Sequence, residues 1–162
     1  MAALKAARAL NSLSCERTEQ KMSKVAVVYW SGTGNTEAMA NAVKSGAQAT
    51  GAQVGFFKAD EFHADMVDSF GAIAFGCPAM GTEELEETEF APMFRSLEGK
   101  LAGKKIGLFG SYGWGGGDWM GKWLNNCRGL SAKLVSGGVA CCGEPDGDAL
   151  TECVNLGRAL AQ

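Results

Sequence analysis

Runs of apolar residues alternate along this chain with segments in which apolar residues recur every three or four positions. The first run, residues 25–30, is rich in β-branched and aromatic side chains, which is typical of a strand buried on both faces. In the next segment, residues 36–50, Met39, Val43 and Gly46 fall on one helix face. Because this alternation continues to the C-terminus, it predicts a parallel sheet with helices on both faces.

Four further strands and four further helical segments are expected. The strands are predicted at residues 53–57, 72–76, 106–110 and about 133–140, and the first of these has the pattern of an edge strand. The helical segments are predicted at 61–69, around Pro92, after Asp118 as an N-cap, and after the turn at 143–146. The fold class is therefore α/β, a doubly wound five-stranded parallel sheet.

Composition and charge narrow the class of protein. The chain has 162 residues, 46% of them hydrophobic and 20% charged, which fits a single soluble globular domain. No apolar run has the length of a membrane span. The net charge is −3, which argues against nucleic acid as a partner and favours basic protein surfaces. A single histidine, His63, and six cysteines without a C-x-x-C pair predict reduced thiols and no metal site.

Residues 1–21 differ from the rest of the chain and are excluded from the fold, as a disordered extension. Up to Cys15 they contain no acid but carry Lys5 and Arg8, as an organellar transit peptide does. Alternatively, Met22 is the true start. The domain is therefore predicted to span residues 22–162, in the cytoplasm or, if the extension is a transit peptide, in a mitochondrion-related organelle.

The turn after the first strand, residues 31–36, predicts a phosphate site. A strand-to-helix turn presents unpaired backbone N–H groups and the positive end of a helix dipole, a combination that binds anions. No lysine or arginine lies in this turn, and Glu37 stands where a Walker loop would have its cation and a dinucleotide motif its third glycine. The alternative interpretation is a plain turn with a good helix cap.

Two further loops supply the apolar and aromatic side chains that the predicted phosphate site lacks. In parallel sheets, ligands bind at the carboxyl ends of the strands, where residues 77–84 and 111–115 are predicted to follow the third and fourth strands. The first loop offers the apolar side chain of Met80, and the second offers Trp114 between glycines. Together the three loops suit a flat heteroaromatic nucleotide. Trp119 and Trp123, at helical spacing, are expected in the core.

Three motifs in this order resemble the flavodoxins, specifically the short-chain type of anaerobic bacteria. They are Ser31-Gly32-Thr33-Gly34-Asn35-Thr36-Glu37, Cys77-Pro78-Ala79-Met80-Gly81 and Gly110-Ser111-Tyr112-Gly113-Trp114-Gly115. The resemblance covers residues 22–162. It implies the strand order 2-1-3-4-5 and FMN as the cofactor, bound at the switch point of the sheet, as in the flavodoxin that exemplifies this rule.

The resemblance also assigns roles to residues. The FMN phosphate is expected at residues 31–36, the inner face of the isoalloxazine ring at Met80, the outer face at Trp114, and ring N3–H at the Glu83 carboxylate. Thr82 and Pro78 depart from the residues common in the family. The expected cofactor-binding set is Ser31, Gly32, Thr33, Gly34, Asn35, Thr36, Pro78, Ala79, Met80, Gly81, Thr82, Glu83, Ser111, Tyr112, Gly113, Trp114 and Gly115.

The function implied is that of a low-potential one-electron carrier, not an enzyme. It would cycle FMN between semiquinone and hydroquinone and substitute for ferredoxin, docking transiently as a monomer onto redox partner proteins. Acidic residues of the second loop are expected to lower the potential of the last electron; they are Glu83, Glu84, Glu86, Glu87 and Glu89. Gly81 is expected to let the carbonyl of Met80 rotate toward flavin N5 on reduction. The alternative is an NAD(P)H-dependent FMN or quinone reductase of the same fold.

Overall fold

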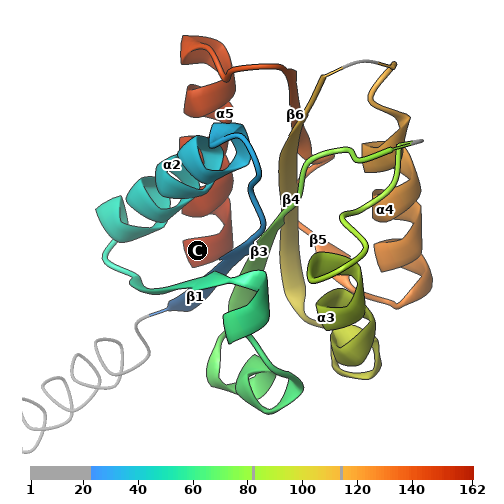
Figure 1. Ribbon diagram of the computed structural model, residues 1–162. Helices are drawn as coiled ribbons and strands as arrows, with labels where there is room; N and C mark the ends of the chain where they lie inside the picture. The colour runs from blue at the N-terminus through green and yellow to red at the C-terminus, as the bar shows by residue number, and fades with distance from the viewer. Residues whose placement is uncertain (1–22, 82, 114) are drawn as a thin grey trace, which may run out of the picture.

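A parallel sheet with helices on both faces forms the centre of the computed structural model, which describes residues 23–81, 83–113 and 115–162 (Figure 1). The strands lie in the order β2-β1-β3-β4-β5, and β6 also pairs with β4. The predicted α/β class and the 2-1-3-4-5 order are therefore confirmed. The expectations for residues 1–21, Thr82 and Trp114 lie outside the described residues.

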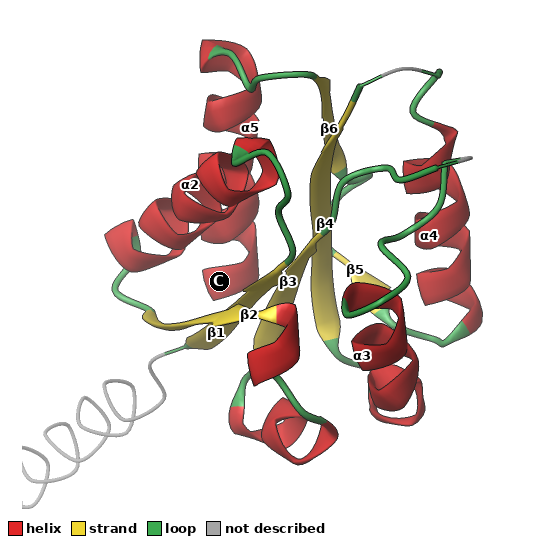
Figure 2. Cartoon of the chain, viewed as in Figure 1, coloured by secondary structure: helices red, strands yellow, loops and turns green. Residues whose placement is uncertain are grey.

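The elements alternate along the chain as the hydrophobic pattern predicts (Figure 2). The strands are β1 (Lys24–Tyr29), β2 (Gln53–Lys58), β3 (Ala72–Gly76), β4 (Lys105–Tyr112), β5 (Lys133–Leu134) and β6 (Val139–Cys142). The α-helices are α2 (Asn35–Ala49), α3 (Phe90–Leu97), α4 (Asp118–Gly129) and α5 (Gly147–Ala161). The helical segment expected at 61–69 is instead two short 3₁₀ turns, η1 (Ala59–Glu61) and η2 (Ala64–Ser69), and a third, η3 (Glu98–Lys100), follows α3. In the described part of the chain, no helix has both the length and the apolar character needed to cross a membrane.

The predicted fifth strand is interrupted, so the sheet has six strands and the prediction of five is wrong in this respect. β5 pairs with β4 as far as Ile106, and β6 resumes the pairing at Phe109. Residues 135–138 therefore lie opposite only two residues of β4, and the chain leaves the ladder after the amide of Val135, which donates to the carbonyl of Ile106 at 3.1 Å. Gly138 has φ +83°, a backbone conformation open mainly to glycine. Glycine inside a strand pattern is the sequence signal for such a break.

Helices α2 and α5 cover one face of the sheet and α3 and α4 cover the other (Figure 1). The α2–α5 contact depends on two glycines that bring the helix backbones together. A Cβ atom at Gly46 would lie 1.9 Å from the carbonyl oxygen of Val154, and one at Gly157 would lie 2.0 Å from that of Val43. No side chain fits at either position without moving a helix.

The core under α3 and α4 is aromatic. Trp123 packs edge-on against Phe90, with ring centroids 5.4 Å apart, and against Phe94 at 5.8 Å. Trp119 is also buried, and its indole N–H donates to the carbonyl of Cys77 at 3.2 Å. The expectation that Trp119 and Trp123 are core residues is therefore confirmed. Through this hydrogen bond, α4 holds the start of the loop that follows β3.

Candidate functional site

The N-terminus of α2 presents backbone donors to the carboxyl edge of the sheet. Its N-cap is Gly34, with φ +94°, which offers no side chain to the first turn. The hydroxyl of Ser31 accepts from the amides of Gly34 at 3.1 Å and Glu37 at 3.2 Å. The amides of Thr33, Asn35 and Thr36 have no acceptor within the described chain. These donors, at the positive end of the helix dipole, form an anion site.

The side chain of Thr36 adds a polar atom without a partner. It is only 1% exposed, and its hydroxyl makes no hydrogen bond with the residues described. An unsatisfied buried hydroxyl costs about 1–3 kcal/mol. This cost is removed when a ligand oxygen accepts from the hydroxyl.

One cavity of about 230 Å³ joins the α2 N-terminus to the two loops expected to hold a ring. Its lining includes ten of the predicted residues: Gly32, Thr33, Asn35, Thr36, Pro78, Ala79, Met80, Ser111, Tyr112 and Gly113. Ser31, Gly34, Gly81, Glu83 and Gly115 do not line it. Trp30 and Gly143 also line it, and the sequence analysis missed both. The position of Trp30, directly before the turn at residues 31–36, could have identified it as a lining residue. No local signal marks Gly143.

A short antiparallel bridge shapes the loop after β3. Met80 and Glu84 exchange backbone hydrogen bonds of 2.8 and 2.9 Å, and Gly81 takes φ +54° between them. Met80 is 39% exposed, as suits a side chain that contacts a ligand. Because its carbonyl already accepts from Glu84 N, its rotation would break this hydrogen bond, and that rotation stays a prediction. The carbonyl of Gly81 accepts from no described residue.

Glu83 connects this loop to α4. Its carboxylate accepts from the amide of Gly117 at 2.8 Å and, through each oxygen, from that of Asp118 at 3.1 Å. Asp118 is the first residue of α4 and does not cap it, so the expectation of an Asp118 cap is wrong. The cap comes from Glu83, a residue of another loop.

Glu86 serves the same purpose for α3. Its carboxylate is 4% exposed and accepts from the amides of Thr88, Glu89 and Phe90 at 2.7–2.9 Å. Burial alone would raise the pKa of Glu86, but these hydrogen bonds and that of the Thr88 hydroxyl outweigh it and hold the pKa below its usual value. Glu86, named above among the acidic residues expected to lower the potential, is therefore a buried cap of α3 and not an exposed charge.

The comparisons with known proteins point to one family. The family model described as Flavodoxin matches residues 27–157. The flavodoxin of Megasphaera elsdenii is 47% identical over 138 residues, which cover 85% of this chain and 98% of the relative, and that of Clostridium beijerinckii is 38% identical, covering 83% and 97%. The chain belongs to the flavodoxin family. The solution structure of two-electron reduced M. elsdenii flavodoxin superposes with a TM-score of 0.78 and covers 85% of this chain and 98% of that one.

These matches confirm the resemblance seen in the sequence. Flavodoxins carry electrons on FMN. The residues present fit this cofactor. The free amides and the Thr36 hydroxyl suit its phosphate, and Met80 and the aromatic Tyr112 line the same cavity.

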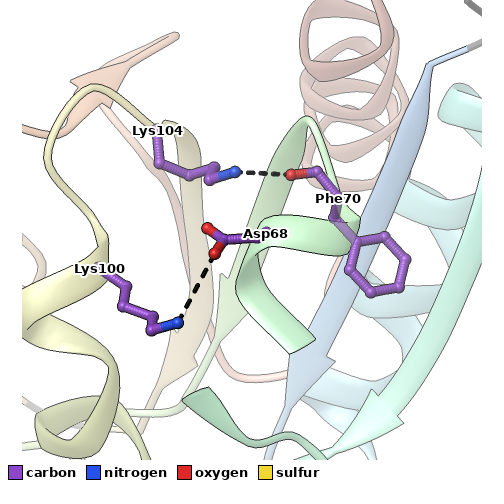
Figure 3. Close-up of polar contacts among 4 residues, drawn as sticks. All are labelled: Asp68, Phe70, Lys100 and Lys104. Atoms are coloured by element: carbon purple, nitrogen blue, oxygen red, sulfur yellow. Dashed lines mark hydrogen bonds and ion pairs between the residues drawn. The ribbon is translucent and has the colours of Figure 1, made fainter. Parts of the chain in front are cut away.

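A second, larger hollow lies at the opposite edge of the sheet and has a different character from the flavodoxin site. It measures about 670 Å³ and is lined by Lys24, Lys104, Lys105 and Lys133. The ammonium of Lys104 donates to the carbonyl of Phe70 at 2.7 Å, and nearby Lys100 lies 3.6 Å from Asp68 (Figure 3). Lys105 donates to the carbonyl of Gln162. Two of the four lysines are thus hydrogen-bonded to the chain itself.

Proposed function

We propose that this chain transfers single electrons between redox proteins on FMN whose phosphate is bound by residues 31–36. The observation that carries this assignment is the unpartnered hydroxyl of Thr36, 1% exposed, beside the free amides at the start of α2. Neutral donors can hold a phosphate without a lysine or arginine because the helix dipole supplies the positive potential.

The ring of FMN lies, in this proposal, between the loops after β3 and β4. Met80 covers its inner face and Trp114 its outer face, and Glu83 accepts from ring N3–H. The exposure of Met80 and the position of Tyr112 and Gly113 in the cavity lining support this placement. The assignment of Trp114 rests on the family motif.

In this proposal, the charges around the site give the bound FMN a low reduction potential. No charged residue of the described chain lines the cavity. Glu84, Glu87 and Glu89 are exposed on the neighbouring loop, and the carboxylate of Glu83 lies at the start of α4. Negative charge near the ring opposes the addition of a further electron and lowers the potential.

The same acidic loop is proposed to dock transiently onto basic surfaces of redox proteins that ferredoxin also serves. The chain acts there as a monomeric carrier and not as an enzyme. We place it in the cytoplasm, because the cysteines of the described residues are unpaired thiols. The fold is proposed to occupy residues 22–162, and deletion of residues 1–21 should leave equimolar FMN binding intact.

Substitution Thr36→Val tests the proposal, because valine keeps the shape and removes the hydroxyl. FMN affinity should fall by about 10- to 100-fold, while the affinity for riboflavin, which has no phosphate, should stay unchanged. Equal losses for both ligands would contradict the phosphate assignment. Steady-state NAD(P)H oxidation with a quinone by the purified holoprotein would contradict the carrier role.

A further inference from the structure

Glu83 joins the two loops at the rim of the cofactor site, and we propose that it is a positioning residue that fixes these loops together before FMN binds. Its carboxylate lies 2.8 Å from the amide of Gly117 and 3.1 Å from that of Asp118, which are 34 and 35 residues further along the sequence. This role is additional to the proposed contact with ring N3–H. The effects of Glu83 on FMN binding rest on the proposed function, whereas its contact with α4 does not.

The start of α4 depends on this contact because the helix has no side-chain cap of its own. Its N-cap is Gly117, with φ +78°, and a glycine has no group to accept from the first amides. The amides at a helix N-terminus need acceptors, and an anion is the favoured one at the positive end of the dipole. Glu83 supplies both the acceptor and the charge.

The backbone of Glu83 is held in an unfavourable conformation that directs its side chain to α4. Its φ is +56°, in the left-handed region that residues with a Cβ atom rarely adopt. The Met80–Glu84 bridge closes the base of the turn with hydrogen bonds of 2.8 and 2.9 Å. Such strain persists where surrounding contacts determine the conformation, and it concentrates at ligand sites.

The loop before α4 also fits closely around the carboxylate. A Cβ atom at Gly115, where φ is +87°, would lie 2.8 Å from Oε1 of Glu83. Only glycine combines this backbone conformation with this approach. Glu83 therefore contacts the end of the loop after β4 as well as α4, and the loop cannot move away from the site without giving up these hydrogen bonds.

Amide hydrogen exchange on the FMN-free protein tests the proposal. In Glu83→Ala, the amides of Gly117 and Asp118 should exchange about tenfold faster or more, because both lose a charged acceptor. Glu83→Gln should restore much of the protection, because its amide oxygen still accepts. The matched control is Glu84→Ala, which removes the neighbouring exposed carboxylate and keeps the backbone bridge, and it should leave both amides unchanged.

FMN binding then separates positioning from direct contact. If Glu83 preorganises the loops, Glu83→Ala should slow FMN association as well as weaken binding, whereas Glu83→Gln should keep the wild-type association rate. Unchanged exchange at Gly117 and Asp118 in Glu83→Ala would overturn the proposal. Failure of the wild-type chain to bind FMN would instead contradict the proposed function, since the exchange measurement needs no cofactor.

Discussion

The two edges of the sheet offer contrasting sites for an anion. The amino edge has the larger hollow, about 670 Å³, and four lysines in its lining, whereas the carboxyl edge has about 230 Å³ and no charged lining residue among those described. Yet at the amino edge Lys104 and Lys105 already donate to carbonyls of Phe70 and Gln162. At the carboxyl edge the hydroxyl of Thr36 has no described partner.

This difference favours an unpaired donor at a cavity, rather than volume or formal charge, as the sign of an anion site. The indole N–H of Trp123 is also unpartnered among the described residues, but it lies in the aromatic core. A lysine ammonium that donates to a carbonyl keeps two further N–H groups, but binding a ligand through them costs their hydration and holds a flexible side chain in one geometry. The buried hydroxyl of Thr36 has no such hydration to lose, and the helix amides already point outward at the positive end of the dipole. The Thr36 hydroxyl and the first amides of α2 are therefore left for a ligand, whereas two of the four lysines are held by the chain.

The largest expected effect is a loss of folding stability when a methyl group is added at the carboxyl edge, in contrast to the amino edge. Gly110→Ala, at the carboxyl edge, would place Cβ 2.1 Å from the carbonyl oxygen of Cys77, and should destabilise the fold by about 3 kcal/mol or more. Gly71→Ala, at the amino edge, would place Cβ 3.8 Å from the carbonyl of Lys24 and should change stability by less than about 0.5 kcal/mol. Urea unfolding of both variants measures the difference, and equal losses would show that the two edges are equally tight.

Removal of the ring that is proposed to stack on FMN should have the next largest effect. Trp114→Ala should weaken FMN binding by roughly 1–3 kcal/mol and relieve the quenching of flavin fluorescence. Trp123→Ala is the control, because its buried ring packs against Phe90 and Phe94 and should mainly affect the fold. If Trp123→Ala instead lost FMN at unchanged stability, the stacking assignment would be wrong.

Glu86, near the carboxyl edge, should make the folding stability depend on pH. Because hydrogen bonds hold its folded-state pKa below the usual value of 4.5, its contribution is complete above that pH and is lost as the pH falls through the lowered pKa. Glu86→Gln should cost about 1–2 kcal/mol at neutral pH, and the difference from wild type should shrink below pH 4.5. Denaturation midpoints across pH measure this. A constant difference at every pH would exclude the charge as the cause.

The smallest expected effect is at the lysine edge. Lys104→Met removes the hydrogen bond to the carbonyl of Phe70 and should cost about 1 kcal/mol of stability, with no change in FMN affinity. Asp68→Asn, which breaks an exposed ion pair with Lys100, should cost about 0.5 kcal/mol or less. Calorimetric titration with FMN checks the affinity, and a clear loss in Lys104→Met would remove the contrast between the edges.

The sequence by itself determined the elements that depend on local pattern. The buried strand before residue 31, the turn at 31–36 and the helix that starts at Asn35 all follow from residues within one short segment. The family motifs in turn predicted the strand order and ten of the residues that line one cavity. Periodicity and turn chemistry act between near neighbours, and a sequence displays them directly.

Only the tertiary structure decided the contacts between distant segments. Asp118 has the right residue type for a cap, but Glu83 from another loop caps α4. Glu86 looks like one more surface acid, and the fold buries it under α3. Gly143 reaches the cavity only because β6 runs beside β4. Glu83 and Gly143 meet partners from other parts of the fold, so no local pattern marks those contacts. The amides that Glu86 binds lie only two to four residues along the chain, but its burial depends on packing.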